Sequence, residues 1–285
     1  MKHIVGFSGG IDSQACARWV LNRYPKDDVI LTNTNAGRNE SPLTDAFVAE
    51  YSRTVHPVTV ITARMKDIWE TEGYAEIRGF DSEEELTFGR MIAIKGRPPS
   101  RKAQFCTSIL KLRPQRRWMR EQFGPGGPLE GEAYTRYAGV RRDESAARAH
   151  APFVQWDEFY DCELHYPITD WSKAMCFAYV EAHGEAYNPL YKLGFSRVGC
   201  APCINSGKDD ILLWRDRFPD MIEKVRGYER DSGRTFFPPC VPGLAMNTID
   251  EVIAWAETSR GGYQPNMLRM FNERPACESK YGLCE

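Results

Sequence analysis

The sequence of 285 residues predicts an α/β fold: a doubly wound, mostly parallel sheet with a helical C-terminal extension. Three observations support this prediction. Short apolar segments alternate with amphipathic segments of about ten residues in the first part of the chain, as in parallel sheets covered by helices on both faces. The first apolar segment runs into a Gly-rich turn that directly precedes a helical pattern. After Cys203, strand-like patterns stop and helical ones continue.

The composition sets limits on function. Hydrophobic residues make up 42% and charged residues 27%, an ordinary globular balance, and the formal net charge is -2. A nucleic-acid partner would therefore need a local basic patch, because the protein as a whole has no positive field. There is neither a signal-peptide pattern nor an apolar run of roughly 18 residues, so we expect a cytoplasmic protein without a membrane partner. In that reducing compartment, nine cysteines suggest metal or thiol chemistry.

The first half of the chain alternates regularly. We expect strands at 3–7, 28–34 and 58–62, with helices at 13–23 and about 43–54. Polar, Gly and Pro residues dominate from about 70 to 105, which predicts a loop-rich insertion. A helix near 110–122 and a strand at 134–140 follow.

The second half is mostly helical. We expect helices at 171–183, 208–230 and 248–258, a Pro-rich loop at 236–243 and an irregular tail. This change of pattern predicts an α/β domain over residues 1–204 and a helical extension with terminal cysteines over 205–285.

The turn "SGGIDS" at residues 8–13 has the features of an anion site. Glycines let the backbone approach a phosphate closely, and a helix N-terminus directs amide N–H groups and partial positive charge toward it. Ser8 and Ser13 can donate hydroxyl hydrogen bonds, and Asp12 is placed to help hold a phosphate-bound Mg²⁺. The alternative is a plain capped turn, since Asp and Ser are good N-caps. A P-loop is excluded because no Lys follows the second Gly, and no GxGxxG pattern is present.

This turn resembles the loop of the PP-loop ATP pyrophosphatases, which have the adenine nucleotide alpha hydrolase-like fold. Further segments resemble the phosphoadenosine-phosphosulfate (PAPS) reductase branch of that superfamily: "FCTSILKLRP", "YAGVRRDESAARA", "YNPLYKLGFSRVGCAPC" and "YGLCE". By motif, the chain is most similar to the sulfur-transfer proteins of DNA phosphorothioation systems (the DndC and SspD type). The resemblance implies ATP and Mg²⁺ as ligands. It also implies that Ser8, Gly9, Gly10, Asp12, Ser13, Asn35 and Gly139 form the nucleotide site.

Cysteines form a second pattern. Cys200 and Cys203 form a CxxC, a spacing that lets two thiolates reach one metal centre. A zinc knuckle or a redox pair is the alternative. The resemblance adds Cys106, and together these residues imply a [4Fe-4S] cluster. Its fourth ligand would be Cys284, with Cys277, Cys240 or no protein ligand as alternatives. Cys16, Cys162 and Cys176 are expected in the core.

Basic residues supply the remaining candidates. Arg141 and Arg142 follow an expected strand, where the family presents Arg to a phosphorylated substrate, and Arg makes bidentate bonds to phosphate oxygens. Lys111 is expected to neutralise the α phosphate. With Asp12, these residues form the expected catalytic set. Glu40, in the loop that contains Asn35, is expected to be a solvated residue.

These features predict an ATP pyrophosphatase that adenylates a substrate oxygen, which sulfur then replaces, in DNA backbone phosphorothioation. A cysteine desulfurase would donate the sulfur, and nucleic acid would be the partner, with DNA ranked above tRNA. The alternatives are a sulfonucleotide (PAPS or APS, adenosine phosphosulfate) reductase, a tRNA thiolation enzyme, and a nucleotide sensor without turnover. The reductases of the family generally lack the complete loop and end in a His-containing tail, which disfavours the first alternative.

Overall fold

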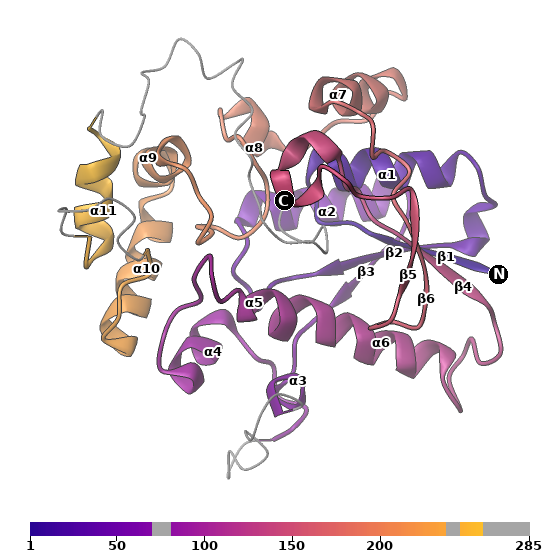
Figure 1. Ribbon diagram of the computed structural model, residues 1–285, viewed down its shortest axis with the longest axis horizontal. Coiled ribbons are helices and arrows are strands. Elements are labelled where there is room, and N and C mark those ends of the chain that lie inside the picture. The colour runs from indigo at the N-terminus through magenta and orange to yellow at the C-terminus, as the bar shows by residue number, and fades with distance from the viewer. Residues whose placement is uncertain (70–80, 238–245, 259–285) are drawn as a thin grey trace.

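The computed structural model describes residues 1–69, 81–237 and 246–258, and its centre is a six-stranded sheet (Figure 1). The strands are β1 (Lys2–Gly6), β2 (Val29–Thr34), β3 (Val58–Ile61), β4 (Tyr134–Tyr137), β5 (Val154–Asp157) and β6 (Cys162–His165). Their order is β3-β2-β1-β4-β6-β5. All neighbouring pairs are parallel except β5 with β6. The predicted doubly wound, mostly parallel sheet is confirmed.

Helices cover both faces of this sheet (Figure 1). One face carries α1 (Ile11–Leu21), α2 (Pro42–Thr54) and α7 (Lys173–Ala182), and the other carries α3 (Met65–Trp69) and α6 (Arg113–Phe123). On the first face, Phe7 and Leu31 of the sheet pack with Val20 of α1. On the second, Ile4 packs with Met119 of α6. Strands buried on both sides explain the continuous apolar runs in the sequence.

The direction and order of the strands indicate which edge of the sheet can bind a ligand. From β1 the sheet extends through β2 to β3 on one side and through β4 on the other. The crevice between the carboxyl ends of β1 and β4 is therefore a topological switch point, where doubly wound sheets bind ligands. The 8–13 turn follows β1, and Gly139 and Arg141 follow β4.

Short helices connect these layers. They are η1 (Lys26–Asp28), α4 (Phe88–Lys95), α5 (Phe105–Thr107), the π-helix η2 (Ser108–Leu112), η3 (Arg142–Glu144), η4 (Ala146–Arg148) and α8 (Pro189–Lys192). The C-terminal helices are α9 (Lys208–Arg217), α10 (Pro219–Ser232) and α11 (Ile249–Ala256). Among the residues that the structure describes, no helix combines the length and apolarity needed to cross a lipid bilayer.

Three expectations need correction. The insertion expected to be loop-rich contains α4, which Thr87 caps at its start and Gly96 ends with φ 64°. The single helix expected at 208–230 is two helices, because Pro219 lacks the N–H that a continuous helix would use. The strand expected at 134–140 ends at Tyr137, and the antiparallel pair β5–β6 was not predicted. Strands of four residues carry too little alternation to be recognised.

The described residues of the extension beyond residue 204 are mostly helical, as predicted, and they share a core with the preceding part of the chain. One apolar cluster contains Met91 of α4 and Leu190 of α8 together with Trp214 and Ile249 from the extension. Figure 1 shows α9, α10 and α11 on the side where the parallel strands end. The helical extension thus lies on the side of the candidate site. The domain division at 204 stays a prediction.

Candidate functional site

Hydrogen bonds to its own hydroxyl groups stabilise the 8–13 turn. Gly9 has φ +81°, a conformation that favours glycine. The Ser13 hydroxyl accepts the amide of Ser8 at 3.1 Å and donates to the carbonyl of Gly10 at 2.8 Å. The Ser8 hydroxyl accepts the amide of Gly10 at 3.3 Å. Both serines therefore fix the path of the backbone.

A segment from a distant part of the sequence supports the turn. Tyr191 of α8 accepts the amide of Ile11, the first residue of α1, at 3.0 Å. Asn188 caps α8 and donates to Thr44 at 3.2 Å. A β-carbon at Gly9 would lie 3.2 Å from Thr44 and 3.6 Å from Asn188. The roles of Asn188 and Tyr191 were not predicted from the sequence, because their contacts depend on tertiary structure.

Asp12 and Arg141 meet at the switch point. The Nε atom of Arg141 lies 2.8 Å from Asp12 Oδ2, and the two side chains are only 5% and 3% exposed. Gly139 approaches the same turn through its backbone. The predicted residues Asp12, Gly139 and Arg141 thus lie together beside the turn, with the Asp12 charge balanced by Arg141. The expectation that Asp12 holds Mg²⁺ stays a prediction.

Arg142 and Asn35 have other local contacts. Arg142 pairs with Asp170 and donates to the carbonyl of Ala151 at 2.9 Å. Asn35 accepts the amide of Gly37 at 3.2 Å. This bond closes a turn in which Ala36, Gly37 and Arg38 all have positive φ. Both side chains stabilise loops at the carboxyl edge of the sheet.

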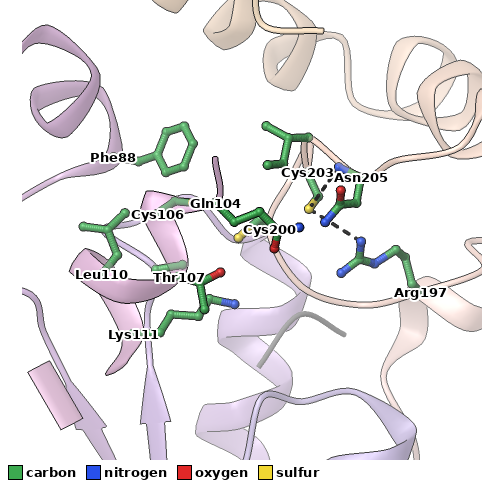
Figure 2. A pocket seen from close by; sticks show the side chains of 12 residues that line it. Phe88, Gln104, Cys106, Thr107, Leu110, Lys111, Arg197, Cys200, Cys203 and Asn205 are labelled. Atoms are coloured by element: carbon green, nitrogen blue, oxygen red, sulfur yellow. Dashed lines mark hydrogen bonds between the residues drawn. The ribbon is translucent and has the colours of Figure 1, made fainter. Parts of the chain in front are cut away.

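Three of the four predicted cluster cysteines line one cavity, which we call the thiol pocket (Figure 2). Its walls are Ala36, Phe88, Gln104, Cys106, Thr107, Leu110, Lys111, Arg197, Cys200, Cys203, Ile204 and Asn205. Cys106 comes from α5, and Cys200 and Cys203 come from the loop after α8. Its free volume is about 20 Å³, room for roughly one water molecule.

Hydrogen bonds organise the loop with the CxxC. Cys203 Sγ lies 3.5 Å from Arg197 Nη1 and accepts the amide of Asn205 at 3.4 Å. The amide of Ala201 donates to Asn39 at 2.7 Å, and Glu40 forms a β-bridge with Cys200. The loop after β2 therefore holds this segment in place.

The [4Fe-4S] cluster stays a prediction, because the described residues supply only three of its four expected ligands. Within residues 1–69, 81–237 and 246–258, no three Cys, His, Asp or Glu side chains lie close enough to share one metal ion. A cluster of several irons holds its thiolate ligands further apart than one ion does. Cys284, the expected fourth ligand, and its alternatives Cys240 and Cys277 lie outside the described residues.

Two buried charged groups adjoin the thiols. Lys111 lines the pocket and is 7% exposed. Glu40 is 5% exposed, so the expectation that it is solvated was wrong. Burial raises the pKa of Glu40 to about 7, against the opposing effect of Lys111. Sequence reasoning missed this residue because its neighbours along the chain are polar.

The remaining described cysteines are structural. Cys16 and Cys176 are fully buried, and Cys162 is 4% exposed, as expected for core residues. Burial raises the pKa of the Cys162 thiol to about 11. We expect these three buried thiols to react more slowly than the partly exposed thiols of Cys106 and Cys200.

A Gly-rich turn at a helix N-terminus, set at the switch point of a parallel sheet, defines a nucleotide-binding α/β protein. Comparison with known families gives the particular class. The chain belongs to the phosphoadenosine phosphosulfate reductase domain family, whose model matches residues 2–206. The family-level resemblance is thus confirmed, and the chain is a member of an enzyme family.

The chain is also similar to individual proteins. The chain is 35% identical to an uncharacterized 37.8 kDa protein of Escherichia phage 186, over 67% of the chain and 62% of that protein. It is 39% identical to the adenosine 5'-phosphosulfate reductase of Neisseria meningitidis, over 32% of the chain and 38% of the reductase. The chain thus matches less than two thirds of these relatives' own length. A crystal structure of the phosphoadenylyl-sulfate reductase from Candida auris matches with a TM-score of 0.46 and 16% identity, covering 70% of this chain and 81% of that one.

Proposed function

We propose that this protein is an ATP pyrophosphatase that adenylates an oxygen of a nucleic-acid acceptor so that sulfur can replace it, with DNA as the preferred acceptor and tRNA as the alternative. The family assignment supports nucleotide chemistry on this fold, and the complete 8–13 turn favours ATP over a sulfonucleotide. The structural observation that carries the proposal is the Gly-rich turn at the start of α1, ordered by hydrogen bonds of Ser8, Ser13 and Tyr191.

The turn would bind the β and γ phosphates of ATP. An acceptor oxygen then attacks the α phosphorus, the bond to the bridging oxygen breaks, and pyrophosphate departs, its charge stabilised by the partial positive charge at the N-terminus of α1. Lys111 and Arg141 neutralise the charge that develops near the α phosphate. A sulfur nucleophile, from a cysteine desulfurase, displaces AMP in the second step. Catalysis is mainly positioning and charge neutralisation.

Cys106, Cys200 and Cys203 would hold a [4Fe-4S] cluster, with an iron left for a further ligand. When bound, the cluster would supply a site for sulfide beside the acceptor. The convergence of three thiols from two segments supports it, as does the amide that donates to Cys203. The present free volume of the thiol pocket is about 20 Å³, which is smaller than such a cluster.

Release of pyrophosphate from ATP tests the proposal. The wild-type protein should release pyrophosphate above background in the presence of Mg²⁺ and a nucleic-acid acceptor. The rate of pyrophosphate release should fall at least tenfold in Asp12→Asn, because this substitution removes a counter-ion of Arg141 beside the turn. Asp27→Asn, a substitution at an exposed site in η1, is the matched control, and thermal unfolding establishes that both variants fold. No pyrophosphate release under anaerobic conditions with either DNA or tRNA would reject the proposal.

A sulfonucleotide reductase is the second candidate, favoured by the similarity to adenosine 5'-phosphosulfate reductases. In that reaction a thiol attacks the sulfur of the sulfonucleotide, and sulfite is released after reduction. The same protein preparation can be given APS or PAPS with a thiol reductant. Release of sulfite without pyrophosphate formation from ATP would establish the reductase in place of the sulfur transferase.

A further inference from the structure

Most basic residues of the segments 111–120 and 136–148 are used inside the protein. Arg117 lies 3.0 Å from Asp67, and Arg136 lies 2.9 Å from Asp157. Arg148 is paired with Glu144 and is almost fully buried. Arg141 is also buried and paired, and the partly exposed Arg142 is paired with Asp170, so these contacts occupy most of the guanidinium groups. A surface for a polyanion must therefore be formed elsewhere.

Exposed positive charge gathers instead between α4 and α5. No Asp or Glu occurs in the sequence between Glu85 and Glu121. A groove of about 580 Å³ is lined by residues of this stretch and by two residues after α10: Lys95, Gly96, Arg97, Pro98, Pro99 and Ser100, with Arg234 and Thr235. Arg101 and Lys102 directly follow this lining segment and are exposed, as are Arg97 and Arg234. We call this surface, from Lys95 to Lys102 with Arg234, the basic groove.

These charges have few competing partners. Across the ranges that the structure describes, no carboxylate forms an ion pair with Arg97, Arg101, Lys102 or Arg234, whereas nearby Arg90 is paired with Glu84. Exposed cations without a carboxylate partner keep their charge available to phosphates. This separates the basic groove from the internally paired arginines.

The loop is also shaped by its own contacts. Pro98 and Pro99 are buried, and Ser100 and Ala103 exchange backbone hydrogen bonds of 3.2 and 3.0 Å. Arg97 and Lys95 lie over the ring of Phe105, with their charged groups 5.1 and 5.7 Å from its centroid. A surface that is already ordered loses less conformational entropy when it binds.

The basic groove lies next to the thiol pocket. Phe88, at the start of α4, lines the pocket, and Lys95, at the end of the same helix, lines the groove. Seven residues of α-helix separate them, a length of about 10 Å at 1.5 Å per residue. Cys106, the residue after Phe105, points into the pocket (Figure 2). A strand in the groove would thus reach the thiols within a few nucleotides.

We propose that the basic groove binds the phosphodiester backbone of a single nucleic-acid strand and directs one of its nucleotides to the thiol pocket. This deepens the proposed function and rests on it for the identity of the acceptor. The charge of a nucleic-acid strand repeats at every phosphate. We therefore favour such a strand over an acidic peptide as the ligand of a groove with several exposed cations. The basic groove is formed by a loop, and among the described residues no long helix projects from it that could enter the major groove of a duplex. This favours a single strand over a duplex.

Binding of fluorescein-labelled 15-nucleotide strands, DNA and RNA, measured by anisotropy without ATP, tests this proposal. Because ATP is absent, the result does not depend on whether the protein cleaves it. The test variant is Arg97→Glu/Arg101→Glu/Arg234→Glu. The matched control is Arg23→Glu/Lys26→Glu/Arg120→Glu, which changes net charge equally at exposed residues by the amino-terminal edge of the sheet. Thermal unfolding checks that both variants fold.

We expect the test variant to bind a strand at least tenfold more weakly than wild type, and the control to stay within twofold. The slope of log affinity against log salt should fall by about 2 in the test variant, since each lost phosphate contact removes ~0.7 for a single strand. Equal binding by the test and control variants would overturn the proposal. So would failure of the wild-type protein to bind either strand, or tighter binding to polyglutamate, which would indicate a protein partner.

Discussion

The backbone of Gly139 lies directly against the backbone of Asp12. A β-carbon at position 139 would be 2.4 Å from the carbonyl oxygen of Asp12 and 2.7 Å from the amide nitrogen of Ser13. Such distances are shorter than real contacts, and the neighbouring atoms are backbone, which cannot rotate away. The loop after β4 and the turn after β1 can meet at the switch point only because residue 139 has no side chain.

Gly139→Ala should therefore push the 8–13 turn out of position. We expect a loss of about 1–3 kcal/mol of unfolding free energy, typical of overpacking, and a larger relative loss in ATP affinity. Urea denaturation and calorimetric titration with ATP measure the two effects. Gly207→Ala is the control, because a β-carbon there meets nothing within 4 Å. Unchanged ATP affinity in Gly139→Ala would show that the close approach is not needed for the site.

Tyr191→Phe tests the support that α8 gives to the turn. The substitution removes the oxygen that accepts the Ile11 amide at 3.0 Å, and leaving a buried donor unsatisfied costs about 1–3 kcal/mol. ATP binding should weaken, because this amide orients the first turn of α1. Tyr187→Phe, on the same segment, is the control. If both substitutions weaken ATP binding equally, the hydrogen bond is not the cause.

The sequence predicted the sheet and the 8–13 turn because both depend on local patterns. Buried parallel strands are apolar along their whole length, and a Gly-rich turn before a helix is visible in six residues. The positions of Asp12, Gly139 and Arg141 beside one another follow from the strand order, which places β4 next to β1. Here the family resemblance supplied what periodicity alone could not.

Contacts between distant segments were not predictable in the same way. Tyr191 bonds to Ile11, 180 residues earlier, and Asn188 bonds to Thr44, 144 residues earlier. Such separations leave no local signal. The segments 111–120 and 136–148 are basic in the sequence, but in the fold Asp67 pairs with Arg117 and Asp157 pairs with Arg136. The charge of a segment can therefore be counted from the sequence, whereas its availability requires the structure.

Thiol labelling should separate the pocket cysteines from the core cysteines. With iodoacetamide at pH 8, Cys106 and Cys200 should react first, since both are partly exposed. Cys162 should react at least tenfold more slowly, because burial raises its thiol pKa to about 11 and little thiolate is present. Peptide mass spectrometry follows each residue, and labelling in urea provides the fully reactive reference. Equal rates for Cys106 and Cys162 in the folded protein would contradict the assignment.

Glu40 should make the stability of the protein depend on pH. Its pKa rises from 4.5 to about 7 in the folded state, chiefly through burial. The folded state then holds a proton that the unfolded state has released, so stability falls as pH rises from about 4.5 to about 7 and levels off above that range. The difference of roughly 2.5 pKa units corresponds to about 3 kcal/mol.

Glu40→Gln has no such proton to lose. The unfolding free energy of the variant relative to wild type should therefore rise by about 3 kcal/mol between pH 4.5 and pH 8, as measured by urea denaturation at each pH. The exposed substitution Glu50→Gln should leave that difference flat. A Glu40→Gln variant whose relative stability is constant across this range would mean that Glu40 is ionised throughout and that Lys111 fully compensates its burial.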